Sequence, residues 1–164
     1  MHDQAFTILE YNQLRHLVRR EAQTPMGGLL IDSLKPMEDQ TVLSQALNEV
    51  AECVALRKRG ASWSFGDLPD PEESFARLRV EGAALSSTAI LTLASICEQA
   101  MVVRASLVNE RPNMPYLWEV VRELPIELNS LVARISNKIL PTGELDDRAS
   151  PELGPTAKVA STRP

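Results

Sequence analysis

Residues 39–60, DQTVLSQALNEVAECVALRKRG, give the clearest structural signal in the sequence. Apolar side chains recur there at helical spacing, at Val42, Leu43, Ala46, Leu47, Val50 and Val54. The basic run Arg57 to Arg59 suits the negative, C-terminal end of a helix dipole. Gly60 follows, and glycine readily adopts the left-handed conformation that closes helices. The stretch therefore predicts a long helix from about Asp39 to Arg59.

A second long helix is predicted from about Leu85 to Val108. Apolar residues surround most of it, and its polar stripe is narrow: Thr92, Ser95 and Gln99. A helix that is apolar nearly all round is typical of a buried position. We therefore expect this helix at the centre of the fold, packed on the first one. The side chains expected to face one another are Leu43, Leu47, Val50, Leu91, Ala94 and Cys97.

Proline and glycine divide the rest of the chain into shorter elements. Helices are expected over residues 6–21, 25–31, 70–81, 116–124 and 125–135, with Thr24 and Asp70 as N-caps that each precede a proline. Residues 138–146 predict one small β-hairpin that turns at Gly143. The expected fold class is all-α, with about seven helices. Residues 1–153 are expected to form one helical core domain, and residues 154–164 a disordered tail.

Composition narrows the class of protein. The 164 residues are 44% hydrophobic and 24% charged, with a formal net charge of −5. This balance suits a soluble globular protein and argues against a free-standing nucleic-acid binder. The two cysteines exclude a disulfide scaffold and favour a reducing compartment. The N-terminus lacks the pattern of a signal peptide, and no stretch approaches the roughly 20 apolar residues that cross a membrane. We expect a cytoplasmic location and no membrane contact.

The sequence contains no recognisable catalytic motif. It has no G-x-x-x-x-G-K-[ST] and no G-x-G-x-x-G sequence, so it offers no phosphate loop. Its two histidines, His2 and His16, do not form a closely spaced ligand pair, and no Cys-x-x-Cys pair occurs. Cys53 and Cys97 lie within apolar helices, as core cysteines do, the alternative being a reactive thiol. The pair Glu72-Glu73 suits helix capping, and Asp146-Asp147 suits a solvated turn. No catalytic, cofactor-binding or metal-binding residue is therefore predicted.

Two groups of basic residues are candidates for ligand contact. They are Arg15, Arg19 and Arg20 in the first helix and Arg57, Lys58 and Arg59 at the end of the third. Such groups can bind phosphates weakly and without sequence preference. The alternative is that they form solvated helix faces and compensate the helix dipole. Trp63 and Phe65 could likewise stack on bases, or pack their loop onto the core.

Several short motifs, in order, resemble the N-terminal part of the bacterial MutS type-two family. They are Leu9-Glu10-Tyr11, Ala22 to Gly27, Leu34-Lys35-Pro36, the Glu49, Glu52 and Ala55-Leu56 set, Gly66 to Asp70, Gly82 to Ser86, and Gly143 to Leu153. The last is the most specific and is close to the family's D-G-x-[IVL]-x-D-x-A-S-x-x-L. Thr142 replaces the aspartate of that pattern.

The resemblance implies a function for a longer protein. Members of the family are dimeric, DNA-binding ATPases, and many end in a nuclease domain. They are associated with suppression of homologous recombination at branched DNA and with rescue of collided ribosomes. ATP and magnesium are the implied cofactors of the full-length family. The implied partners are the remainder of the protein, a second copy, and branched DNA or the ribosome.

This chain resembles only the part that precedes the ATPase domain, and it lacks the phosphate loop and nuclease residues. It is therefore expected to be an inactive structural fragment when isolated, with no cofactor of its own. The alternative is a stand-alone helical protein-interaction module without nucleic-acid or catalytic activity.

Overall fold

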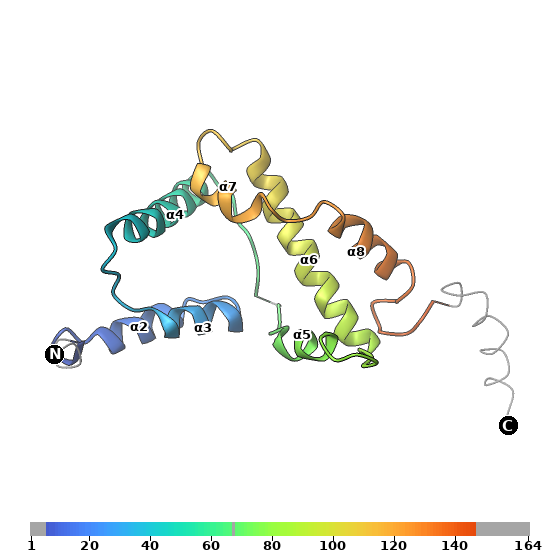
Figure 1. Ribbon diagram of the computed structural model, residues 1–164. Coiled ribbons are helices and arrows are strands. Elements are labelled where there is room, and N and C mark those ends of the chain that lie inside the picture. Colours follow the sequence, from blue (N-terminus) through green and yellow to red (C-terminus); the bar gives the residue numbers. More distant parts are fainter. Residues whose placement is uncertain (1–5, 67, 147–164) are drawn as a thin grey trace, which may run out of the picture. The chain divides into compact units, whose positions relative to one another are not determined.

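The computed structural model describes residues 6–66 and 68–146, and these residues are mostly helical (Figure 1). The helices are α2 (Tyr11–Arg19), α3 (Pro25–Ser33), α4 (Gln40–Lys58), α5 (Glu72–Leu78), α6 (Ser87–Val108), α7 (Pro115–Val121) and α8 (Leu128–Ser136). Within the described residues the only β pairing is an isolated antiparallel bridge between Ile139 and Leu145. The predicted all-α fold is confirmed, and the expected hairpin is reduced to this bridge. The expected tail, residues 154–164, lies outside the described residues, as does the end of the family motif after Asp146.

Local signals explain where α3 begins and where α4 begins and ends. The Thr24 hydroxyl accepts a hydrogen bond from Gly27 N at 3.0 Å, and Pro25 occupies the first turn of α3. The Asp39 carboxylate accepts from Thr41 N at 2.7 Å and from Val42 N at 3.2 Å. Gly60 has a φ of +88°, the left-handed conformation expected after α4. These caps satisfy backbone groups that the helix itself leaves unpaired.

Two details of the predicted helices are wrong, a break within the first helix and the start of α5. The helix expected over residues 6–21 is interrupted at Glu10, which has a left-handed φ of 51° that no regular helix tolerates. Asp70 is not the cap of α5, because Pro71 occupies that position, and Pro71 has no side-chain group that could cap the helix. The helix begins one residue later than the sequence pattern suggested.

The chain divides into two compact units, of which the first comprises Met1–Asp70 with Asn109–Val120. Helices α2 and α3 lie side by side in it (Figure 1). Arg19 of α2 forms an ion pair with Asp32 of α3, N to O 2.5 Å. The same guanidinium lies over Gly28, where an added Cβ would be 3.5 Å from Arg19 Cζ. The buried apolar side chains of this unit include Leu56, Met114 and Leu117.

Glu52 of α4 joins that helix to α7. Its two carboxylate oxygens accept hydrogen bonds from the backbone N–H groups of Tyr116, at 3.2 Å, and Leu117, at 2.8 Å. These N–H groups belong to the first turn of α7, where they lack partners within the helix. A second link joins Arg59 to Glu110 at 2.8 Å. The carboxylate therefore acts as a cap supplied by a distant part of the chain.

The second unit comprises Pro71–Val108 with Val121–Pro164. Helices α6 and α8 lie side by side in it (Figure 1). The bridge segment is tied to the start of α6, because the Ser87 hydroxyl donates to Gly143 O. Thr142 Oγ1 accepts from Glu144 N at 3.4 Å and so takes the turn position that the family pattern gives to aspartate. The buried apolar residues of this unit are Ala94, Met101, Leu107, Val121 and Ile139.

Replacement of Gly143 by alanine is expected to destabilise the second unit by about 1–2 kcal/mol, because a Cβ strains a left-handed backbone. Gly143 has a φ of +86°, and its Cβ would also lie 3.1 Å from Thr88 Cγ2. Gly82→Ala is the matched control, since Gly82 has a φ of +77° and open space around it. Urea unfolding of both variants measures the difference. Equal losses would show that the contact with Thr88 contributes nothing.

The predicted core residues of α4 are not buried within the first unit, and the predicted burial of α6 is overstated. Leu43, Leu47 and Val50 of α4 are exposed, so they are not part of the core of that unit. In α6 only Ala94, Met101 and Leu107 are buried, and Cys97 and Leu91 are half-buried. The expectation that no segment could cross a membrane also needs correction. By length and composition alone α6 could do so, with a mean hydropathy of 1.4.

Candidate functional site

The basic residues of α2 are largely engaged with α3 and its neighbours. The Arg15 guanidinium donates through Nη1 to Leu34 O at 3.5 Å and through Nη2 to Asn12 Oδ1 at 3.2 Å. Arg19 is paired with Asp32. Arg20 follows α2 and is exposed. Two of these three predicted contact residues therefore hold the α2–α3 pair together.

Of the three basic residues at the end of α4, one is paired and two are exposed. Arg59 pairs with Glu110, and the Glu110 carboxylate also accepts from Asn113 Nδ2 at 3.2 Å. The side chains of Arg57 and Lys58 are exposed and make no hydrogen bond or ion pair with any residue that the structure describes. Of the six predicted residues, Arg20, Arg57 and Lys58 thus keep a cation available to a ligand. Arg57 differs from the other two because it borders a cavity.

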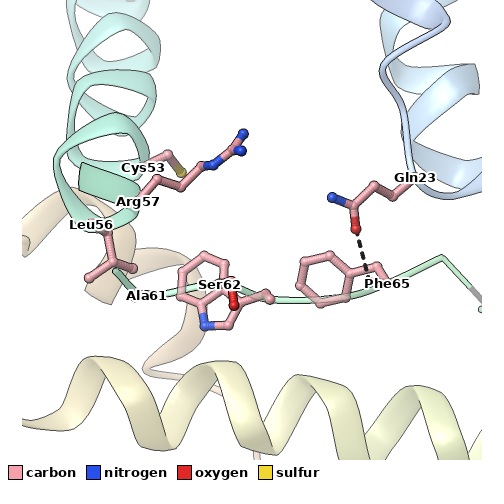
Figure 2. Close-up of a pocket in the computed structure, with 8 residues that line it drawn as sticks. Gln23, Cys53, Leu56, Arg57, Ala61, Ser62 and Phe65 are labelled. Atoms are coloured by element: carbon pink, nitrogen blue, oxygen red, sulfur yellow. Dashed lines mark hydrogen bonds between the residues drawn. The ribbon is translucent and has the colours of Figure 1, made fainter. Parts of the chain in front are cut away.

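That cavity has a volume of about 300 Å³ and lies at the C-terminal end of α4. It is lined by Gln23, Cys53, Leu56, Arg57, Ala61, Ser62, Trp63 and Phe65. Figure 2 shows Cys53, Leu56 and Arg57 on α4, the segment 61–65 crossing below them, and Gln23 on the opposite side. Leu56 is 6% exposed and provides an apolar surface. The cavity is therefore mainly apolar, with an arginine and an amide at its edge.

The loop carrying Trp63 and Phe65 is held by Gln23. Phe65 N donates to Gln23 Oε1 at 3.0 Å, across 42 positions of sequence (Figure 2). The two rings are tilted by 51°, with centroids 6.4 Å apart. Both side chains are half-buried, so the loop packs partly onto the first unit, which was one of the two alternatives. Gln23 had no signal in the sequence that could have placed it here.

The Cys53 thiol is held in its neutral form. Burial raises its pKa, and the carboxylates of Glu52 and Glu49 raise it further. All three effects disfavour the thiolate, which is the nucleophilic form. The Cys53 pKa is higher in the folded chain than in the unfolded chain, so below the unfolded pKa this thiol leaves the fold at its full stability. The free energy of unfolding then decreases as the pH rises from the unfolded pKa through the folded pKa.

Cys53 is accordingly expected to react slowly with iodoacetamide at pH 8, about fivefold or more below its rate in the urea-unfolded chain, because little thiolate is present. Mass spectrometry of the peptide containing Cys53 measures the rate. The half-buried Cys97 serves as an internal comparison. A native rate equal to the unfolded rate would contradict this description of the site.

The described residues contain no group of three or more His, Cys, Asp or Glu side chains placed to hold a metal ion. Glu72 and Glu73 lie in the first turn of α5, where acidic residues favour the helix dipole. Asp147, the partner of Asp146 in the second acidic pair, lies outside the described residues.

The described residues thus define an all-α chain with a small, mainly apolar cavity bordered by one arginine. No protein-family profile matches the chain. Curated relatives are nevertheless found among the bacterial MutS2 endonucleases. The chain is 24% identical to Endonuclease MutS2 of Lacticaseibacillus casei over 156 residues and 25% identical to that of Clostridium perfringens over 154. It is 28% identical to that of Gemmatimonas aurantiaca over 155 residues.

Each match covers 93% of this chain but only 19–20% of the relative. The chain therefore spans about one fifth of the length of the curated relatives it matches. Low identity that extends over nearly the whole chain supports a relation to the MutS2 endonucleases.

Proposed function

We propose that this chain is the N-terminal helical part of a MutS2-type protein, and that it acts by packing against the remainder of that protein. The sequence similarity extends over 93% of the chain and one fifth of the relatives. The ordered motifs, from Leu9 to Asp146 in the described residues, resemble those of the family's N-terminal region, which supports this placement. Most of a MutS2-type protein thus lies outside the matched segment and is available to contact it.

The observation that supports the proposal is an exposed apolar stripe on α4. It consists of Leu43, Leu47, Val50 and Val54, which are 39%, 60%, 60% and 47% exposed. Their spacing of four, three and four residues places them on one face of a helix, as in the seam of a coiled coil. Contiguous apolar surface of this kind marks a protein contact in soluble proteins.

The opposite face of α4 is the one that packs within the first unit. Glu52 and Leu56 lie about half a turn away from the stripe, since a helix has 3.6 residues per turn. Glu52 bonds to the start of α7, and Leu56 is buried. The helix therefore uses its more polar side internally and presents its apolar side outward. Small residues, Ala46 and Ala51, flank the stripe and would let another helix approach closely.

The whole-protein roles follow from the same similarity and belong to this proposal. We propose a cytoplasmic, homodimeric, DNA-binding ATPase and endonuclease that acts in recombination control or ribosome rescue. ATP and magnesium would be bound by parts of the protein beyond this chain. In this chain, α6 would serve as a helix of a water-soluble protein and contact no membrane.

The experiment compares hydrogen exchange of α4 in the isolated chain and in the longest product of its gene. We expect the amides of residues 43–54 to be at least about tenfold more protected in the longer product, because the docked face stabilises the helix. The double variant Leu47→Asp, Val50→Asp should abolish that gain. Gln45→Asp, on the opposite face, should retain it.

Two results would contradict the proposal. One is a gene product no longer than this chain, which would favour the stand-alone interaction module. The other is equal protection of α4 in both forms, which would show that the stripe contacts nothing in the longer protein.

A further inference from the structure

We propose that the cavity at the end of α4 binds a small planar aromatic compound that carries an anionic oxygen group, either a carboxylate or a phosphate. Nothing in the similarity to MutS2 endonucleases assigns a ligand to this place. The cavity lies at the C-terminal end of α4, where its lining residues Cys53 and Arg57 flank Val54, the last residue of the stripe, in the sequence. The test below uses this chain alone, so its outcome does not depend on the proposed packing function.

The walls of the cavity suit an aromatic ring. Trp63 and Phe65 are half-buried, and their rings are 6.4 Å apart between centroids and tilted by 51°. At this distance the two rings contact each other, so they form one continuous aromatic wall of the cavity against which a ligand ring can pack. Leu56, 6% exposed, adds an apolar surface. The volume of about 300 Å³ is at the small end of the roughly 300–1,000 Å³ of ligand pockets, which limits the ligand to one or two fused rings.

The edge of the cavity suits an anion. Arg57 is exposed and unpaired among the described residues, so its planar guanidinium can bind a carboxylate or phosphate through two parallel hydrogen bonds. Gln23 already accepts the Phe65 N–H with its oxygen, which fixes its amide and leaves the nitrogen to donate. Figure 2 shows Arg57 and Gln23 extending from opposite sides into the same space above residues 61–65.

The nearby acidic groups do not cancel this preference. The Glu52 carboxylate is directed to the backbone of Tyr116 and Leu117 and is neutralised in part by that helix end. Glu49 accepts from Gln45 Nε2 at 3.1 Å, one turn further from the cavity. The Cys53 thiol, which does line the cavity, stays neutral because burial raises its pKa. Arg57 is thus the only charged side chain among the lining residues.

The test is a titration of the full chain followed by NMR of the two tryptophan indole N–H groups. The probes are 2-naphthoate, adenosine monophosphate and the uncharged 2-naphthalenemethanol. We expect the Trp63 signal to shift with a roughly millimolar dissociation constant for 2-naphthoate, as small ligands of this size give. The Trp118 signal, from a ring that Arg111 covers at 4.0 Å, should stay in place. The uncharged probe should bind about tenfold more weakly, because it cannot form the charge-assisted pair with Arg57.

The two anionic probes distinguish which anionic group the cavity accepts. Binding of 2-naphthoate alone assigns a carboxylate, binding of adenosine monophosphate alone assigns a nucleotide phosphate, and binding of both assigns the shared chemistry. Arg57→Gln should weaken anion binding about tenfold, while Lys58→Gln, the adjacent exposed cation outside the cavity, should not. The proposal is overturned if no anionic probe shifts Trp63, if the uncharged probe binds equally well, or if both variants behave alike.

Discussion

Replacement of Leu107 by alanine is expected to lower the free energy of unfolding of the second unit by about 2–5 kcal/mol. Leu107 is 1% exposed, on the last turns of α6, and is one of the two large side chains most completely buried in the described residues. Truncation removes apolar contacts and leaves a cavity that a close-packed interior fills only in part. Urea unfolding measures the loss. Hydrogen exchange of α6 and α8 then shows whether it is confined to this unit.

Val102 provides the matched control on the same helix. It is 50% exposed, and alanine has the higher helix propensity, so Val102→Ala should change stability by less than about 0.5 kcal/mol. A loss below about 1 kcal/mol for Leu107→Ala, or equal losses for both variants, would show that Leu107 is not in a packed core.

The boundaries of the helices were largely predictable because their causes are local. Thr24, Asp39 and Gly60 act on backbone groups within four residues of themselves, so the sequence pattern contains the whole interaction. The start of α5 and the break at Glu10 are the exceptions. The left-handed backbone of Glu10 interrupts an otherwise regular amphipathic pattern, and no glycine or proline marks the position in the sequence.

The core could not be predicted from periodicity. An apolar stripe identifies a face of a helix but does not say what covers it. On α4 the stripe of Leu43, Leu47, Val50 and Val54 is exposed, while Leu56, outside that stripe, is buried. The apolar composition of α6 likewise predicted a central helix, although only three of its residues are buried.

In the candidate site, too, the local features were predictable and the contacts between distant residues were not. The six basic residues were found by charge alone, but their roles depend on partners that are distant in sequence. Asp32 lies 13 positions from Arg19, and Glu110 lies 51 positions from Arg59. The cavity depends on Gln23, 42 positions from Phe65, with no charge or spacing that links them. Such pairs become visible only when the chain is folded.

Glu52 makes its hydrogen bonds across 64 and 65 positions of sequence, and its removal should have a large effect. Glu52→Ala is expected to destabilise the first unit by about 1.5–3 kcal/mol, because charge-assisted hydrogen bonds are stronger than neutral ones. The variant leaves the Tyr116 and Leu117 N–H groups without the acceptor they have at 3.2 and 2.8 Å. Urea unfolding gives the magnitude, and hydrogen exchange at these two amides should accelerate first.

Glu49→Ala tests whether the effect comes from the cap rather than from the loss of an acidic residue. Glu49 is one turn away on the same helix and accepts a hydrogen bond from the exposed side chain of Gln45, so about 0.5 kcal/mol or less should be lost. Glu52→Gln keeps one oxygen acceptor but no charge, and an intermediate loss is expected. If Glu52→Ala and Glu49→Ala cost the same, α7 does not depend on α4 for its first turn. A free energy of unfolding that increases in the order Glu52→Ala, Glu52→Gln, wild type would instead show that a carboxylate from α4 holds α7 in the first unit.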